Sequence, residues 1–162
     1  MTEGTIELLE KEGNQKPGDY FTMEIESKSQ NEAFARVVVA VFLSRLNPTM
    51  EEVEDVKTAV SEAVTNAVIH GYDGKAVCGD GTPALVYIAA GIEGRQLTVT
   101  ITDKGRGIGN VKQAMEPMFT TDTTGERSGM GFSFMEAFMD ELQVESAPGQ
   151  GTTVTMKKRI GR

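Results

Sequence analysis

One stretch of the chain combines a carboxylate, an amide and an imidazole at the spacing of a helical turn. In S-E-A-V-T-N-A-V-I-H, residues 61 to 70, Glu62, Asn66 and His70 recur every four residues and so line one edge of a helix. A carboxylate there can act as a general base, and an amide oxygen beside it can complete a hydrated Mg²⁺ shell. A solvated polar face is the alternative, although Asn is a poor helix former in mid-helix.

A glycine-rich segment, D-K-G-R-G-I-G at residues 103 to 109, follows an alternating strand. Glycine at every second position permits positive φ angles and close approach of the backbone to a ligand. Asp103, leaving the strand, can accept a hydrogen bond from an exocyclic amine. A tight Asp-Gly turn explains the same residues, and the segment alone does not separate the two interpretations.

A second glycine-rich segment, G-E-R-S-G-M-G-F-S-F-M at residues 125 to 135, leads into a predicted helix. Free N–H groups at a helix N-terminus suit anions, and Arg127 adds a positive charge. The competing interpretation is a Ser128 N-cap with flexible glycines. We expect the large apolar residues of this helix in the core: Phe132, Phe134, Met135 and Phe138.

The elements that position these segments are predicted from hydrophobic periodicity. Residues 20–27 alternate as a half-buried strand. A helix is expected from Ser29 to Leu46, ended by Asn47-Pro48. Its apolar stripe consists of Phe34, Val37, Val38, Val41 and Phe42. Thr49 and Glu52 form a capping box for the next helix, which runs to about His70 and stops at Gly71.

The second half of the chain supplies two hairpins. Residues 73–83 have the composition of a loop, and two strands follow, joined by a turn at Glu93-Gly94. A helix at about 130–140 precedes two final strands joined by P-G-Q-G. The order β-α-α-β-β, loop, α-β-β predicts an α/β fold, a two-layer sandwich with a mostly antiparallel mixed sheet and helices on one face.

Length and composition limit the possible functions. The 162 residues suit one domain, assigned to residues 19–162, after a poorly ordered extension at residues 1–18. A net charge of −8 argues against nucleic-acid binding. The sequence shows no signal peptide and no apolar run near the roughly 20 residues that span a membrane, so we expect a cytoplasmic protein.

Taken together and in this order, the segments resemble the GHKL ATPase superfamily. E-A-V-T-N-A-V-I-H-G resembles its N-box, D-K-G-R-G-I-G its first glycine box and G-E-R-S-G-M-G-F its second. G-Q-G-T-T-V is similar to the late glycine-threonine element. All four with compatible spacing are far more specific than any one, and the resemblance implies the Bergerat type of ATP-binding fold.

Further motifs resemble the sporulation anti-sigma F factors, serine protein kinases that also sequester a sigma factor. They are N-E-A-F-A-R-V-V-V-A, L-N-P-T-M-E-E-V, F-T-T and the run that follows Gly125. The resemblance extends from about Tyr20 to Arg159. It implies a sigma factor and an anti-anti-sigma protein as partners, a homodimer through the sheet and first-helix region, and Arg36 as a partner contact.

The same resemblance implies roles at the nucleotide site. Glu62 would be the general base and Asn66 would ligate Mg²⁺ bridging the phosphates of ATP or ADP. Asp103 would bind the adenine amine, with Gly105 and Gly107 in the first glycine box and Thr152 or Thr153 assisting. The lid over the phosphates would be formed by Thr120, Thr121, Arg127, Ser128, Gly129 and Gly131.

Two alternatives remain open from the sequence. One is a related general-stress kinase that acts on another sigma factor, which the residues around Arg36 disfavour. The other is a binding module in which nucleotide shapes the surface without phosphoryl transfer, which the presence of Glu62 disfavours. A histidine kinase is disfavoured because the chain has a single His, and we expect His70 to make a structural hydrogen bond.

Overall fold

The computed structural model describes residues 18–116 and 131–161 of the chain. The elements are β1 (Asp19–Glu26), α2 (Asn31–Leu43), η1 (Ser44–Leu46), α3 (Met50–Asn66), η2 (Ala67–Gly71), β2 (Leu85–Glu93), β3 (Gln96–Asp103), α4 (Val111–Ala114), α5 (Gly131–Phe138), β4 (Glu141–Ser146) and β5 (Thr152–Arg159). This order confirms the predicted succession of strands and helices. Of the predicted extension 1–18, all but Gly18 lies outside the described residues.

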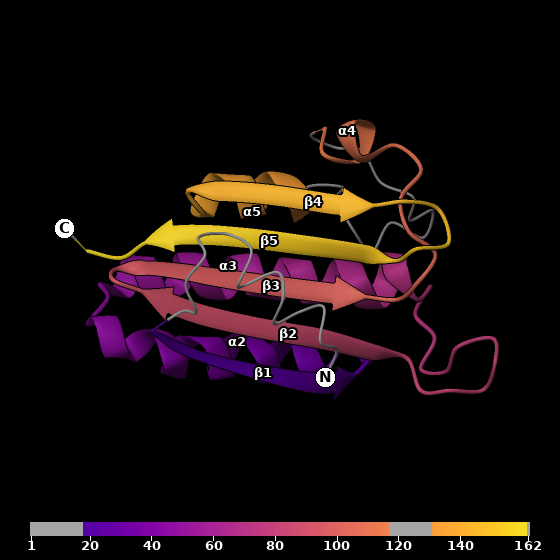
Figure 1. The fold of residues 1–162 in the computed structure, drawn as a ribbon, viewed down its shortest axis with the longest axis horizontal. Helices are drawn as coiled ribbons and strands as arrows, with labels where there is room; N and C mark the ends of the chain where they lie inside the picture. Colours follow the sequence, from indigo (N-terminus) through magenta and orange to yellow (C-terminus); the bar gives the residue numbers. More distant parts are fainter. Residues whose placement is uncertain (1–17, 117–130, 162) are drawn as a thin grey trace.

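The strands form one sheet in the order β1-β2-β3-β5-β4. Each neighbouring pair is antiparallel, so the sheet is more regular than the mixed sheet expected. Figure 1 shows α2, α3 and α5 together behind the sheet, which gives the predicted two layers. Strand β3 is central, and Asp103 at its end lies opposite Thr152 at the start of β5.

Two helix boundaries lie where the sequence predicts them, at the Thr49–Glu52 capping box and at Asn47. Thr49 accepts a hydrogen bond from the Glu52 N–H and Glu52 accepts one from the Thr49 N–H, which confirms the capping box. Asn47 ends the preceding 3₁₀ turn in the left-handed region, with φ of 48°. The end of the second helix differs from expectation, because α3 continues into a π turn, η2, closed by the Tyr72 N–H on the Ala67 carbonyl.

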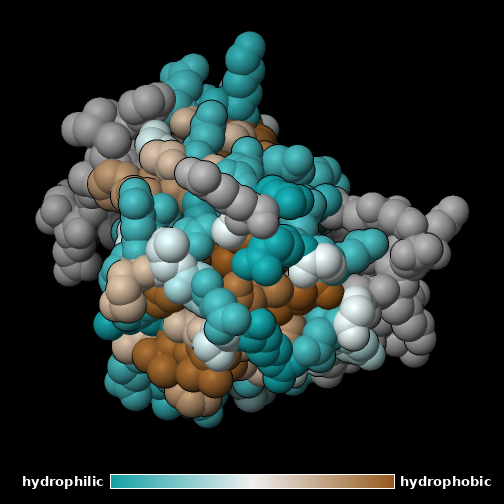
Figure 2. All heavy atoms as spheres, turned by 90° about the vertical axis from the view of Figure 1, so that its left-hand side faces the viewer, coloured by the Kyte–Doolittle hydropathy of each residue, from teal (hydrophilic) through white to brown (hydrophobic). Residues whose placement is uncertain are grey.

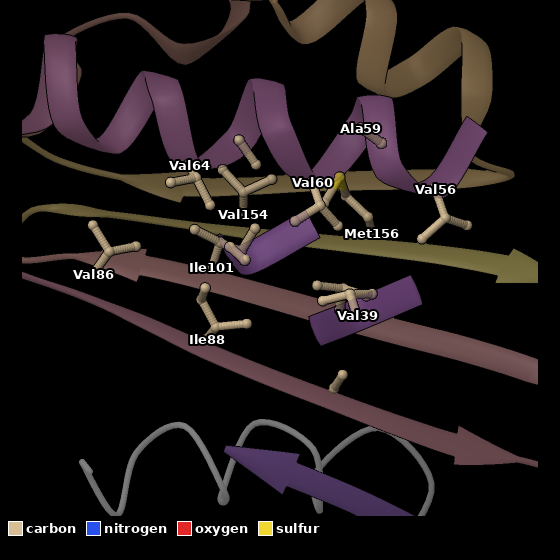
Figure 3. Close-up of a cluster of buried hydrophobic side chains, with 14 of the residues drawn as sticks. Val39, Val56, Ala59, Val60, Val64, Val86, Ile88, Ile101, Val154 and Met156 are labelled. Atoms are coloured by element: carbon tan, nitrogen blue, oxygen red, sulfur yellow. The ribbon is translucent and has the colours of Figure 1, made fainter. Parts of the chain in front are cut away.

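The core lies between α3 and the sheet. Figure 3 shows the valines of α3 pointing at branched and sulfur-containing side chains from β2, β3 and β5. The labelled α3 side chains include Val56, Val60 and Val64, all fully buried. Val154 and Met156 of β5 are buried in the same core.

The apolar stripe predicted for the first helix is largely wrong. Phe34, Val37 and Val41 are 57%, 52% and 66% exposed. The residues of α2 that pack on the core are instead Ala35, Val39, Phe42 and Leu43. Two apolar stripes run along this helix, and the stripe with Ala35 and Val39 is the one that is buried where α2 packs against α3. Phe34, Val37 and Val41 are called the α2 patch below.

The aromatic residues of α5 also depart from expectation, because none of Phe132, Phe134 and Phe138 is fully buried. Met135 is fully buried as predicted, but Phe134 is 37% exposed and stacks on Phe138, with ring centroids 6.2 Å apart. The helix turns Met135 and Met139 toward the core, and a periodicity of 3.6 residues then carries Phe134 outward. Within the described residues, no helix is long and apolar enough to cross a membrane.

The segment predicted as a loop at residues 73–83 has regular hydrogen bonding. Val77 and Pro83 form an isolated antiparallel bridge, and the Ala84 N–H donates to the Ala76 carbonyl at 2.9 Å. The Cys78 N–H donates to the Thr82 carbonyl at 2.7 Å. The segment is therefore a small hairpin between the end of η2 and the start of β2.

Candidate nucleotide site

A cavity of about 520 Å³ opens between the end of α3 and the ends of β3 and β5. The helix contributes Ala63, Asn66, Ala67 and His70, and the strands contribute Ile101, Asp103, Thr152 and Val154. The segment after β3 and the first residues of α5 complete the wall. The structure thus brings the N-box, the first glycine box and the late threonine element to one cavity.

Asp103 is the buried charge of this cavity. The residue is 5% exposed, and its Oδ1 accepts a hydrogen bond from the Gly105 N–H at 2.9 Å. Burial raises the pKa of Asp103 to about 6, against the lowering effect of hydrogen bonds from the Gly105 and Thr152 backbone. Above that pH it is a carboxylate beside apolar walls, an acceptor suited to a ligand amine.

Two glycines in this site are required for different physical reasons. A side chain at Gly71 would place its Cβ between 2.6 and 2.8 Å from the carboxyl atoms of Asp103. Glycine is therefore required at position 71 because the Asp103 carboxyl occupies the space of a side chain. Its φ does not lie in the left-handed region that a glycine cap usually adopts. Gly107 has a φ of 75°, and any Cβ there would collide with the Ala147 carbonyl.

The helix side of the cavity separates the two polar N-box residues. Asn66 lines the cavity directly. Glu62 is half-buried and lies one turn earlier on α3, about 6 Å along the axis, outside the cavity wall. Of the pair, only the amide of Asn66 is therefore part of the cavity wall.

The two threonines at the start of β5 have opposite orientations. Thr152 is 8% exposed, lines the cavity, and lies 2.8 Å from the Ser146 hydroxyl. Thr153 points to the other face of the sheet, where its hydroxyl is 3.2 Å from that of Thr102. Alternation along a strand allows one of the two to face the ligand, and that one is Thr152.

The predicted lid falls mostly outside the described residues. This applies to Thr120, Thr121, Arg127, Ser128 and Gly129. Gly131, at the start of α5, is buried and lines the cavity together with Phe132. Phe132 was expected in the core, and the structure places it at the boundary between core and cavity.

Two residues that the sequence interpretation did not use belong to the site. Arg106 lines the cavity, and its Nε donates to the His70 carbonyl at 2.8 Å. The Tyr72 hydroxyl donates to the Leu85 carbonyl at 2.7 Å and accepts from the Lys104 N–H at 2.8 Å. Arg106 could have been found as one of two cations inside the glycine box, beside Lys104, whereas nothing in the local sequence signals the role of Tyr72.

The donor set of the cavity limits how a divalent cation could be held. The described residues contain no group of three or more His, Cys, Asp or Glu side chains placed to hold a metal ion. Mg²⁺ commonly uses one or two protein oxygens and completes its shell with water and substrate phosphates. A single amide oxygen at Asn66 fits that habit, provided that phosphates supply the remaining ligands.

Comparisons with known proteins agree with this geometry. Residues 25–158 match the histidine kinase-like ATPase domain family. The chain is 54% identical over 135 residues to a protein named anti-sigma F factor from Thermoanaerobacter sp.. This match covers 83% of this chain and 90% of the relative. In Clostridium beijerinckii the identity is 56% over 139 residues, with 86% and 93% covered.

Solved structures share the fold at low sequence identity. A Mycobacterium tuberculosis protein described by its RsbU and RsbW domains superposes with a TM-score of 0.63 at 21% identity. The match covers 91% of this chain and 34% of that protein. The catalytic domain of the histidine kinase ThkA gives a TM-score of 0.52 at 15% identity, over 86% of this chain and 96% of that domain.

Proposed function

The chain belongs to the anti-sigma F factors, within the histidine kinase-like ATPase family, and we propose that it sequesters a sporulation sigma factor and phosphorylates a serine of its antagonist. The antagonist would be an anti-anti-sigma protein, and Mg-ATP would be the phosphoryl donor. The observation that carries the nucleotide part is the buried Asp103 carboxyl in a cavity that Asn66 also lines. Because sigma factors act inside the cell, the proposed function requires the cytoplasm.

The cavity suits the adenine end of a nucleotide. Ile101, Val154 and Phe132 provide apolar wall, and the Asp103 carboxylate can accept from an exocyclic amine. An adenine bound there would direct its phosphates toward Asn66. The lid residues predicted from the second glycine box would then close over the phosphates, with Arg127 as the cation.

In the proposed transfer step, Glu62 on α3 accepts the proton of the substrate serine. The serine Oγ attacks the γ-phosphorus, the bond to the β–γ bridging oxygen breaks, and ADP leaves with that electron pair. The serine proton passes to the Glu62 carboxylate, whose position one turn beyond Asn66 supports this role. Mg²⁺, when bound, supplies charge neutralisation at the phosphates, and Asn66 is the residue that would hold it.

The α2 patch and Arg36 support a protein-binding role for the first helix. Three large apolar side chains exposed on one helix mark an interaction surface more often than a free one. Arg36, 39% exposed, lies beside them and pairs with Glu32 at 3.3 Å. Its Nε has no hydrogen-bond partner within the described residues. We assign homodimer contact to the patch and sigma-factor contact to Arg36.

The decisive experiment follows phosphoryl transfer to the antagonist. The full chain is incubated with Mg-ATP and an anti-anti-sigma protein from the same genome, and phosphoserine is quantified by mass spectrometry. Glu62→Gln is expected to slow transfer by about 10²- to 10⁴-fold and to leave the ATP Kd within about twofold. Glu54→Gln, an exposed Glu on the same helix, is the matched control.

The possible outcomes separate the competing functions. Undiminished transfer by Glu62→Gln would remove Glu62 as the base. A wild-type chain that binds ATP and sigma factor without modifying the antagonist would be a nucleotide-dependent binding module. Preference for a stress-response antagonist over a sporulation antagonist would favour the general-stress kinase.

A further inference from the structure

Arg106 joins the glycine box to the end of η2 on the wall of the cavity. Its backbone N–H donates to the Gly71 carbonyl at 2.9 Å, and its Nε donates to the His70 carbonyl at 2.8 Å. Its NH1 lies 3.1 Å from Oδ1 of Asp73. Arg106 thus contacts the carbonyls of His70 and Gly71 at the end of η2 and also the side chain of Asp73.

Helix carbonyls at this end need donors, and a cation suits them. The last carbonyls of a helix have no partner inside the helix and form the negative end of its dipole. Arg106 satisfies two of them from a different segment of the chain. The planar guanidinium can donate to a carbonyl and to Asp73 at the same time, which a lysine ammonium on a flexible stem does less well.

Arg106 holds the end of η2 at a fixed distance from the loop after β3, and the carboxyl of Asp103 lies between these two segments. Gly71 lies against the carboxyl of Asp103, and a side chain at Gly105 would collide with the Gly71 carbonyl. The end of η2 and the loop after β3 are in van der Waals contact, so a small separation of the two would move Asp103 or open a gap beside it.

We propose that Arg106 is a positioning residue for nucleotide binding, which locks the end of η2 to the loop after Asp103, with Asp73 holding its guanidinium. The proposal rests on the nucleotide site of the proposed function. The ion pair itself is about half exposed, at 47% for Arg106 and 48% for Asp73, so its Coulombic contribution is small. The effect lies in the geometry that the pair imposes on the cavity.

The position of Arg106 predicts which kinetic quantity changes. It lies three residues after Asp103, the carboxylate that the proposed function assigns to the adenine amine, and adenine is common to ATP and ADP. Its loss is therefore expected to weaken ATP and ADP binding by the same factor. Transfer at saturating ATP is expected to continue at nearly the wild-type rate, because the proton-accepting edge of α3 is untouched.

The test measures the Kd for ATP and ADP by calorimetry and the kcat and KM for ATP in the transfer assay. Arg106→Gln is expected to raise both Kd values and the KM about three- to tenfold, with kcat within twofold. Arg106→Lys should recover part of the loss. Asp73→Asn should give a smaller loss, and the double variant should bind no worse than Arg106→Gln, because Asp73 acts through Arg106.

The chain offers a matched control in Arg45→Gln. Arg45 pairs with Asp19 at similar exposure, 53% and 50%, far from the cavity. Nucleotide affinity in Arg106→Gln equal to that in Arg45→Gln would overturn the proposal, and so would a fall in kcat and in apo melting temperature that accompanied the higher Kd. If the wild-type chain bound neither ATP nor ADP, the proposed function itself would fail, which is a separate result.

Discussion

The buried carboxyl of Asp103 lowers the stability of the fold at neutral pH, and the proposed function gives it a role as the acceptor for adenine. Its carboxyl is enclosed by Gly71, Gly105 and the apolar end of β3, and burial raises its pKa to about 6. A buried carboxylate with few donors is costly until a ligand amine reaches it. Asp103 is therefore a poor contributor to the stability of the apo fold at neutral pH, and the same carboxylate is suited to the acceptor role that we propose for it.

The pH dependence of stability follows from this shift. The native pKa of Asp103 lies above the usual 3.8, so the native state holds its proton more tightly than the unfolded state. The stability linked to this proton is present below about pH 4 and is lost as the pH rises through about 6. The difference corresponds to about 3 kcal/mol at most.

Asp103→Asn tests both sides of this balance. At pH 7.5 the variant removes the buried charge, so we expect the apo melting temperature to rise by several degrees and the gain to vanish at pH 4.5. ATP affinity should fall more than tenfold, because an amide is a weaker acceptor than a carboxylate. Calorimetry at both pH values checks the two effects, and a variant less stable than wild type at pH 7.5 would contradict the interpretation.

At the scale of elements, the segment after α3 connects the helix to β2 and to the glycine box through hydrogen bonds of Tyr72. The π turn η2 places Tyr72 so that its hydroxyl joins the first residue of β2 to the residue after β3. The Tyr72 pKa is raised to about 12, chiefly by burial, so the hydroxyl remains a donor at all physiological pH values. Helix, strand and glycine box are thereby fastened at one side chain.

Tyr72→Phe is expected to loosen this junction. It leaves the Lys104 N–H and the Leu85 carbonyl without their partner, a loss of about 1–3 kcal/mol. Urea unfolding should show a lower midpoint with an unchanged slope, since the exposed area on unfolding stays the same. Tyr20→Phe, at an exposed tyrosine of β1, is the control, and equal midpoints for the two variants would contradict the role given to Tyr72.

For the molecule as a whole, the nucleotide cavity and the α2 patch lie on different parts of the helical layer. The cavity occupies the end of α3, whereas the patch is on the outer side of α2. Figure 2 views the molecule from the left of Figure 1 and shows brown apolar surface near the bottom, the level of α2 and β1 in Figure 1. Changes at one surface should therefore spare the other.

Two variants of the first helix test this separation. Arg36→Ala is expected to weaken sigma-factor binding at least fivefold with ATP affinity nearly intact, measured by parallel titrations. Val41→Asp should shift sedimentation toward a monomer, and Val77→Asp, exposed in the 73–83 hairpin, should not. Equal loss of sigma factor and ATP in Arg36→Ala would remove Arg36 from the partner surface.

The sequence predicted the features that local spacing encodes. The capping box at Thr49 and Glu52 and the alternation in β3 follow from short-range patterns, whereas the convergence of Asn66 with Asp103 was expected from the family resemblance. These features are robust because a single turn or pleat decides them.

Choices made by tertiary packing were not predictable from the same patterns. Helix α2 has two apolar stripes, and only packing against α3 selects Ala35 and Val39 over Phe34 and Val41. Phe134 faces outward because Met135 of α5 and Met139 just after it occupy the core. The donation of Arg106 to His70 joins residues 36 positions apart, which no local spacing encodes.

The close approach at Gly71 and Gly105 also restricts how such a sequence can drift over evolutionary time. A side chain at either position would collide with backbone or with Asp103, so neither site can vary without dismantling the pocket. Exposed rim positions such as Arg106 and Gln113 face no such barrier. Divergence in nucleotide affinity among descendants of this chain is therefore expected to accumulate at the rim, while the pocket floor stays fixed.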